Sequence, residues 1–79
     1  MESPAAIAFG NVLKRLRNQR AMSQNALATA AEVHRVHISR LERGERAPSL
    51  ETMLLLCQAL GVSLTAMSAA IEAELLLRR

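Results

Sequence analysis

A chain of 79 residues, of which 51% are hydrophobic and none forms a low-complexity run, predicts one folded domain with a small core rather than a disordered segment. It has one Phe, no Trp or Tyr and one Cys, which disfavours the stacking surfaces of single-strand and RNA-binding modules and excludes an internal disulfide bond. The net charge is +3, and eight of the ten Lys and Arg lie in residues 1–48, which favours a polyanion-binding part followed by an association part.

Apolar residues recur at helical spacing along the whole chain, and no stretch shows the sustained alternation of a strand. The first helix is expected over residues 5–21, where one face contains Phe9, Val12, Leu13 and Leu16. The second is expected to begin after the N-cap Ser23 and to run to about residue 31, with an inner face of Leu27, Ala28 and Ala31.

A third helix is expected over about residues 34–43, and Gly44 is expected to end it. Its inner face contains Ile38, Leu41 and Glu42, and its outer face contains Arg35, Val36, His37 and Arg40. Only a short turn separates it from the second helix, so residues 23–43 are expected to form a helix-turn-helix. The basic and polar outer face makes the third helix the candidate recognition helix.

The fourth helix is expected to begin after Pro48, with Ser49 as its N-cap, and to end at Gly61. Its inner face contains Met53, Leu56, Cys57 and Leu60. Since Cys57 lies on this apolar face, we interpret it as a packed thiol.

The fifth helix is expected over about residues 64–79, with Ser63 or Ser68 as its N-cap. Arg78 and Arg79 at its end favour the negative end of the helix dipole. The helix is apolar nearly all round, and a chain this small cannot bury every face of it. It is therefore the candidate dimerisation element.

Five short blocks of residues lie on these helices and at their boundaries. They are Gly10-x-x-Leu13-x-x-Leu16-Arg17, Met22-Ser23-Gln24-x-x-Leu27-Ala28, Ile38-Ser39-x-Leu41-Glu42-x-Gly44, Pro48-Ser49-Leu50 and Leu60-Gly61-Val62-Ser63. In this order and spacing they resemble the Cro/phage-repressor (XRE-like) family of helix-turn-helix regulators. The resemblance covers residues 9–67 and implies that residues 1–79 form a single all-α domain with a compact five-helix, lambda-repressor-like fold. It also implies sequence-specific binding of duplex DNA as a homodimer.

The resemblance implies roles for three further residues. Arg17 is expected to pair with a buried Glu42, in an ion pair that holds the fold rather than contacting DNA. Gln24 is expected to contact a phosphate and to brace the start of the recognition helix. The chain departs from the family at Glu32, where a glycine is common in the turn, and a left-handed conformation of Glu32 costs about 1 kcal/mol. The outer face of the third helix also has its own composition of two His and two Arg, so its target need not resemble that of a relative.

Groove geometry assigns the DNA contacts, because a helix fits the major groove and residues near its N-terminus reach base edges. Base contacts are expected from Arg35, Val36, His37 and Arg40. Contacts to the DNA backbone are expected from Gln24, His34, Ser39, Arg43 and Arg46. His34 is interpreted as a cap or a phosphate contact. For Lys14 and Arg15 two alternatives remain: each contacts a phosphate, or each is only a solvated surface residue.

Two copies related by a two-fold axis would bind a near-palindromic operator with half-sites about 34–36 Å apart. The dimer interface is expected at Leu55, Ile71, Leu75 and Leu76, since a large apolar patch is a liability on the surface of a monomer. The alternative is that some of these residues only cover the core of one monomer.

Enzymatic and cofactor functions are disfavoured. His34 and His37 are spaced to share a metal ion but have no Cys or Asp nearby, so no metal, cofactor or small-molecule ligand is expected. There is also no pairing of a nucleophile with a base and no glycine-rich phosphate loop. No apolar run approaches the about 18 residues of a membrane span, and the first residues do not follow the pattern of a secretory signal, so a cytoplasmic protein is expected.

Two functions remain. The first is a homodimeric, DNA-binding transcription regulator; the alternative is an antitoxin-like or adaptor protein whose last helix docks a protein, with DNA binding secondary. The first function is compatible with three kinds of regulator: a phage or plasmid repressor, a restriction–modification controller and an antitoxin-like autoregulator. The chain length and the apolar last helix are similar to those of the restriction–modification controllers. The sign of regulation and any contact with RNA polymerase, a toxin or an enzyme stay open.

Overall fold

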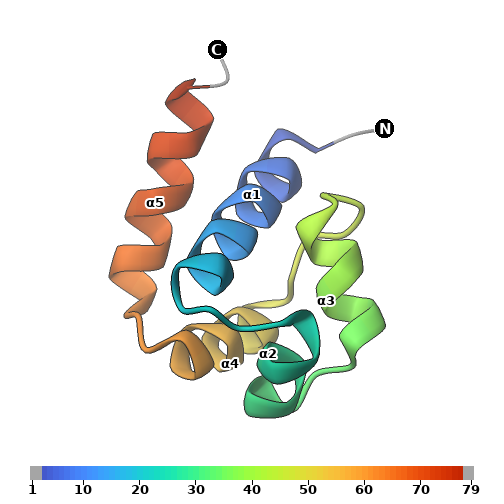
Figure 1. Ribbon diagram of the computed structural model, residues 1–79. Helices are drawn as coiled ribbons and strands as arrows, with labels where there is room; N and C mark the ends of the chain where they lie inside the picture. The colour runs from blue at the N-terminus through green and yellow to red at the C-terminus, as the bar shows by residue number, and fades with distance from the viewer. Residues whose placement is uncertain (1–2, 78–79) are drawn as a thin grey trace.

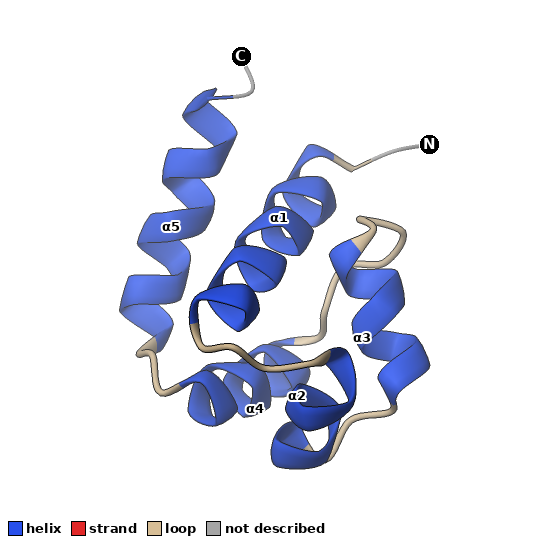
Figure 2. Cartoon of the chain, in the orientation of Figure 1, coloured by secondary structure: helices blue, strands red, loops and turns tan. Residues whose placement is uncertain are grey.

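The computed structural model describes residues 3–77, which form five helices and, over this range, no strand (Figures 1 and 2). The helices are α1 (Pro4–Gln19), α2 (Gln24–Ala31), α3 (Arg35–Glu42), α4 (Leu50–Leu60) and α5 (Leu64–Leu77). The predicted all-α, five-helix fold is thus confirmed. The expected end of the last helix, with Arg78 and Arg79, lies outside the described residues.

α1 lies in the middle of the molecule, with α5 along one side and α3 along the other, while α2 and α4 lie at one end (Figure 1). The inner faces of the helices meet in a single core. Its largest fully buried side chains are Phe9, Val12, Leu13, Leu27, Ile38, Leu41, Leu56 and Met67. Leu16 and Met53 pack at the edge of this core, so the inner faces expected for the first four helices are those that the fold uses.

Serine side chains begin four of the five helices. The hydroxyl oxygens of Ser3, Ser23, Ser49 and Ser63 each accept a hydrogen bond, at 2.9–3.2 Å, from the backbone amide three residues later. Of the two N-caps considered for α5, Ser63 is therefore the correct one. The exception is α3, where His34 is the N-cap residue, in agreement with one of its two expected roles, but its side chain makes no capping hydrogen bond.

Residues with a left-handed backbone conformation lie at the end of a helix or shortly after it. Gly61 ends α4 at φ 70° and Gly44 follows α3 at φ 73°, and in both glycine has no Cβ to resist the conformation. Glu32 ends α2 at φ 56°, as anticipated. The chain turns after α1 through Ala21 at φ 54°, so α1 ends at Gln19, two residues before the predicted end.

Gly10 allows α1 and α3 to approach to backbone contact. A Cβ at this position would lie 2.9 Å from the carbonyl oxygen of Glu42 and still closer to that of Leu41. A Cβ on Gly44 would likewise lie 3.0 Å from the Cα of Ile7 in α1. Both ends of this contact therefore need a residue without a side chain, and together they fix the position of α3 on α1.

α5 directs one stripe of side chains toward the core and leaves the rest in solvent. Met67 is fully buried, Ile71 packs against the core, and Leu76 and Leu77 are exposed. Within residues 3–77 no single helix is long and apolar enough to cross a membrane; α4 and α5 together reach that length and composition, but they are bent by 104° at their junction.

The left-handed turn after α2 provides a test of local strain. Glu32→Gly is expected to stabilise the domain by about 1 kcal/mol, because glycine adopts this conformation without the steric penalty of a Cβ. For a domain of this size that corresponds to a rise in Tm of about 4–8 °C in a thermal melt. Ala30→Gly, at an exposed position inside α2, is the control and should lower Tm, since glycine weakens a helix interior. A lower Tm for Glu32→Gly would show that the Glu32 side chain outweighs the strain.

Candidate functional site

A tight turn joins α2 to α3. The amide of Glu32 donates to the Thr29 carbonyl at 3.3 Å, and that of Val33 donates to the Ala28 carbonyl at 3.0 Å. These bonds satisfy carbonyls that the end of a helix leaves without partners. The chain then enters α3 directly, so α2 and α3 form a helix-turn-helix.

Most of the outer face of α3 is exposed to solvent. Val36 is 53% exposed, although it is apolar, and Arg35 and Arg40 are exposed beside it. His37 and Ser39 are half-buried at the flanks of this face. Of the four residues expected to contact bases, Arg35, Val36 and Arg40 are therefore exposed and His37 lies beside them. Ile38, Leu41 and Glu42 point into the fold.

Arg17 of α1 and Glu42 of α3 form an ion pair in the interior of the fold. Arg17 Nε donates to Glu42 Oε2 at 2.6 Å and its Nη2 donates to Oε1 at 3.0 Å, which is the bidentate geometry suited to a guanidinium and a carboxylate. The two side chains are 11% and 3% exposed. The hydrogen bonds to Glu42 raise the pKa of Arg17 above its ordinary value.

Two further hydrogen bonds connect this pair to the start of α2. Arg17 Nη1 donates to the Met22 carbonyl at 2.8 Å, and Gln24 Nε2 donates to Glu42 Oε1 at 3.1 Å. Gln24 was expected to brace the start of the recognition helix, and this expectation is wrong, because its partner Glu42 is the last residue of α3. The physical reason is that the ion pair places the Glu42 carboxylate within hydrogen-bond reach of the first turn of α2.

Arg43 is the centre of a second, exposed cluster at the end of α3. Its guanidinium donates to the Ser39 hydroxyl and, at 2.6 Å and 3.4 Å, to both carboxylate oxygens of Glu45. These hydrogen bonds hold the pKa of Glu45 below its ordinary value and raise that of Arg43. Two of the residues expected to contact the DNA backbone are thus linked to each other, and Glu45, which the sequence analysis did not single out, is their partner.

Arg20 has a structural role that the sequence analysis did not predict. Its Nε donates to the Leu60 carbonyl at the end of α4, and its Nη1 donates to the Leu16 carbonyl at 3.2 Å. The guanidinium satisfies carbonyls at two helix ends, where a positive charge also favours the helix dipoles. No local sequence signal identifies this role, because Leu60 is forty residues away in the chain.

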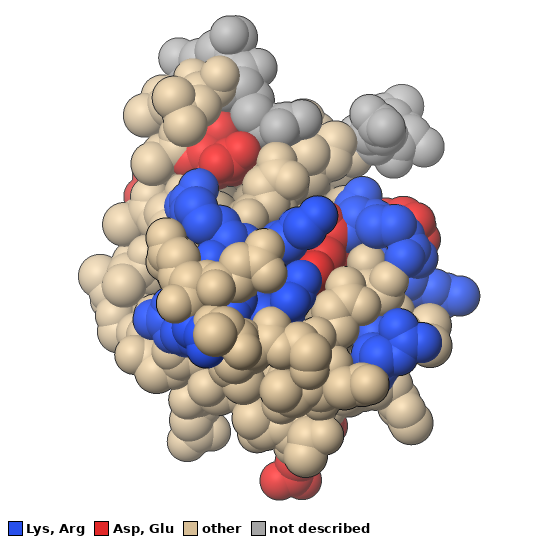
Figure 3. Space-filling model, viewed as in Figure 1, with Lys and Arg blue, Asp and Glu red and all other residues tan. Residues whose placement is uncertain are grey.

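Basic side chains gather on the face of the molecule formed by α1 and α3 (Figure 3). The exposed Lys and Arg of these helices and of the segments that directly follow them are Lys14, Arg15, Arg20, Arg35, Arg40, Arg43 and Arg46. Residues 49–77, which include α4 and α5, contain no Lys or Arg. The basic residues, which are concentrated in the first part of the sequence, are therefore also separated in space from α4 and α5.

The residues expected at a dimer interface lie on α4 and α5 and differ in exposure. Leu55 and Leu76 are 38% and 62% exposed, whereas Leu75 is half-buried and Ile71 packs against the core of its own chain. Other apolar residues of α4 that sequence reasoning did not include, Leu50 and Leu54, are also exposed. The sequence could have identified Leu50 and Leu54 as exposed, because both lie outside the apolar stripe that forms the inner face of the helix.

A shallow groove lies where α4 meets α5, beside this apolar surface. It is lined by Glu51, Leu54, Leu55, Cys57, Gln58, Val62 and Leu64. Cys57 is buried, and its desolvation raises the pKa of the thiol, which disfavours the reactive thiolate and agrees with a packing role. Among residues 3–77 no group of three or more His, Cys, Asp or Glu is placed to hold a metal ion.

The interior ion pair leads to a stability prediction. Glu42→Gln keeps the shape of the side chain but leaves Arg17 as an uncompensated, largely buried charge, so it should destabilise the domain by about 3 kcal/mol or more. Urea denaturation followed by circular dichroism measures this change. Glu45→Gln, which breaks the exposed pair with Arg43, is the control and should leave the unfolding midpoint almost unchanged. Equal effects of the two substitutions would contradict a special role for the interior pair.

Comparisons with known proteins match this architecture. Residues 13–67 match the helix-turn-helix family HTH_3. The chain is 35% identical, over 69 residues, to control protein C.MunI from Mycoplasma sp., covering 86% of this chain and 93% of that protein. It is 36% identical, over 63 residues, to control protein C.BamHI from Bacillus amyloliquefaciens, covering 78% of each.

Solved structures give the same result in three dimensions. The restriction-modification controller protein C.Esp1396I, in the crystal structure of its tetramer bound to its natural 35-base-pair operator, superposes with a TM-score of 0.88. The identity is 28%, and the match covers 95% of this chain and 99% of that chain. This similarity extends over all five helices rather than the helix-turn-helix alone.

Proposed function

The chain belongs to the XRE-type helix-turn-helix family and is similar to controller proteins, and from this we propose that it is a transcription regulator that binds an operator in duplex DNA. The observation that carries the proposal is the exposed outer face of α3 on a basic side of the molecule. A duplex is a polyanion whose major groove admits a helix, so both features are complementary to it.

In the proposed complex, α3 enters the major groove. Arg35 and Arg40 are suited to bidentate hydrogen bonds with guanine, each worth about 1–3 kcal/mol of base discrimination, and Val36 is suited to a thymine methyl group. His37, at the flank of the outer face, donates to a guanine acceptor. Arg35, Val36 and Arg40 are exposed and face away from the core, so they need no rearrangement of the fold to reach base edges.

Backbone contacts flank the groove on both sides of α3. Ser39, Arg43 and Arg46 contact phosphates from its C-terminal end, and His34 contacts one from its N-terminal end. Gln24 has one amide hydrogen bond to Glu42 and keeps a second N–H for a phosphate near the start of α2. Such contacts set the register and orientation of α3 without reading sequence.

We also propose that the chain acts as a homodimer through α4 and α5. Leu55 and Leu76 are the exposed centre of this interface, with Leu75 and the outer edge of Ile71 beside them. Burying these side chains against a second copy removes apolar surface from water, and a two-fold axis places two recognition helices on a near-palindromic operator. By similarity to the restriction-modification controller protein C.Esp1396I, the regulated genes belong to a restriction–modification operon, and the protein works in the cytoplasm, beside its DNA.

The first experiment is selection of bound duplexes from a random DNA library with purified protein at moderate salt. We expect enrichment of an inverted repeat whose spacing locates the two-fold axis. A folded protein that enriches no sequence would contradict the proposal. That result would favour the alternative function, in which the apolar surface of α4 and α5 docks a protein such as a toxin or an enzyme.

The base contacts are tested one at a time. Arg35→Ala and Arg40→Ala should each relax the base preference at one position of each half-site, because each removes one bidentate contact while its exposed side chain leaves the core intact. Repeating the library selection with each variant measures the preference. Gln58→Ala, exposed on α4, is the control. Unchanged preferences in both arginine variants would show that α3 lies differently in the groove.

The interface is tested by adding charge to its exposed centre. The double substitution Leu55→Glu and Leu76→Glu should give a folded monomer, because two copies would bury four carboxylates against each other. Sedimentation equilibrium measures the mass, and circular dichroism checks the fold. Operator affinity should fall strongly, since one helix in one groove binds weakly. A dimer that survives the substitution would place the interface elsewhere.

A further inference from the structure

One stripe of α1 lies along α3, and one member of that stripe, Lys14, is exposed to solvent. Ile7, Gly10, Lys14 and Arg17 follow one another at intervals of three or four residues, which places them on the same side of a helix. Ile7 meets Gly44, and Gly10 meets the last carbonyls of α3. Arg17 binds Glu42. Lys14, between them, is exposed, and among the described residues it has no ion pair.

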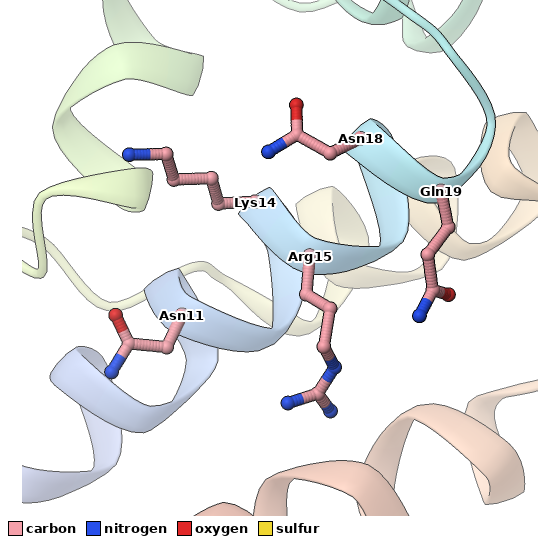
Figure 4. Close-up of a pocket in the computed structure, with 5 residues that line it drawn as sticks. All are labelled: Asn11, Lys14, Arg15, Asn18 and Gln19. Carbon is pink, nitrogen blue, oxygen red and sulfur yellow. The ribbon is translucent and has the colours of Figure 1, made fainter.

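The next residue in the chain, Arg15, is placed differently. Figure 4 shows the Lys14 side chain extending toward α3, on the same side of α1 as that of Asn18, whereas Arg15 extends toward α5. Arg15 Nη1 pairs with Glu74 of α5 at 3.4 Å. These residues line one shallow hollow together with Asn11 and Gln19, and Lys14 extends from the hollow toward α3.

This edge continues the surface that we assign to the DNA backbone. The contacts of Gly10 and Arg17 with Leu41 and Glu42 place Lys14 beside the C-terminal end of α3. Arg43 follows Glu42 directly and binds Ser39, one turn earlier on the outer side of α3. On the other side, Asn18 follows Arg17, whose guanidinium reaches the Met22 carbonyl just before α2.

We propose that Lys14 binds a phosphate of the duplex, so that α1, and not only the helix-turn-helix, contacts the DNA backbone, with the Asn18 amide as an additional donor on the same strand. The inference rests on the proposed function, since it assigns new contact residues to the same complex. A lysine suits this position because its flexible stem and three donors reach a phosphate without a fixed geometry. Its charge would release counterions from the duplex on binding.

The test compares two charge-removing substitutions at adjacent residues. Lys14→Gln should weaken binding of the selected duplex and of a scrambled duplex of equal length by similar factors, because a phosphate contact does not read sequence. The slope of log K against log salt concentration should become less steep by about 0.9, the value for one phosphate contact. Fluorescence anisotropy across a salt series, with both duplexes, measures these slopes.

Arg15→Gln is the matched control. It removes the same charge one residue away, on the side that faces α5, so its slope should stay close to that of the wild type. Lys14→Arg should restore the wild-type slope, and Asn18→Ala should weaken both duplexes without changing the slope, since it removes no charge. Thermal melts of the four variants check that the domain stays folded.

The outcomes separate the inference from the proposed function. If the wild type binds both duplexes but Lys14→Gln and Arg15→Gln change the slope equally, Lys14 acts only through the overall field, and the inference is overturned. If Lys14→Gln leaves the slope unchanged, it is overturned as well. If the wild type binds neither duplex at any salt concentration, the proposed function fails, and this inference fails with it.

Discussion

The ion pair between Arg17 and Glu42 is the interaction on which the functional surface depends. Together with Gln24 and the Met22 carbonyl, it connects α1, the start of α2 and the end of α3 through four hydrogen bonds. These are the three elements that must hold a fixed relation if α3 is to present its outer face at a defined angle. An apolar contact has no preferred direction, whereas a bidentate ion pair fixes orientation, and this explains why a charged pair lies here in a small core.

Close backbone contact between α1 and α3, together with the ion pair, fixes the position of α3. Gly10 lets the carbonyls of α3 approach α1, and Gly44 lets the loop after α3 pass close to Ile7. α3 is only eight residues long and would not be stable as an isolated helix. Its stability comes from these contacts and from the burial of Ile38 and Leu41. The exposed residues on its outer side are therefore not needed to hold the helix in place. A substitution at an exposed outer residue of α3 is therefore expected to leave the position of the helix unchanged.

Charge and apolar surface are separated along the chain and in space. The exposed cations lie on α1, α3 and the loop that follows, and the exposed leucines lie on α4 and α5. A polyanion and a second apolar surface can then bind at once without competing for the same face. Arg20, which satisfies carbonyls of both α1 and α4, connects the two parts.

The sequence by itself determined the five helices, most of their caps, the inner faces and the helix-turn-helix, because these follow from periodicity and from capping chemistry that acts over a few residues. It also determined that Arg35, Val36 and Arg40 of α3 point outward, whereas His37, which was expected on the same face, is half-buried. Only the tertiary structure decided that Gln24 serves the end of α3, that Arg20 binds the end of α4, and that Ile71 packs inward while Leu50 and Leu54 do not. Likewise, it alone separated Lys14 from Arg15, two adjacent cations that the sequence treated alike. Each of these depends on which helix lies opposite, and that relation is set by contacts between residues far apart in the chain.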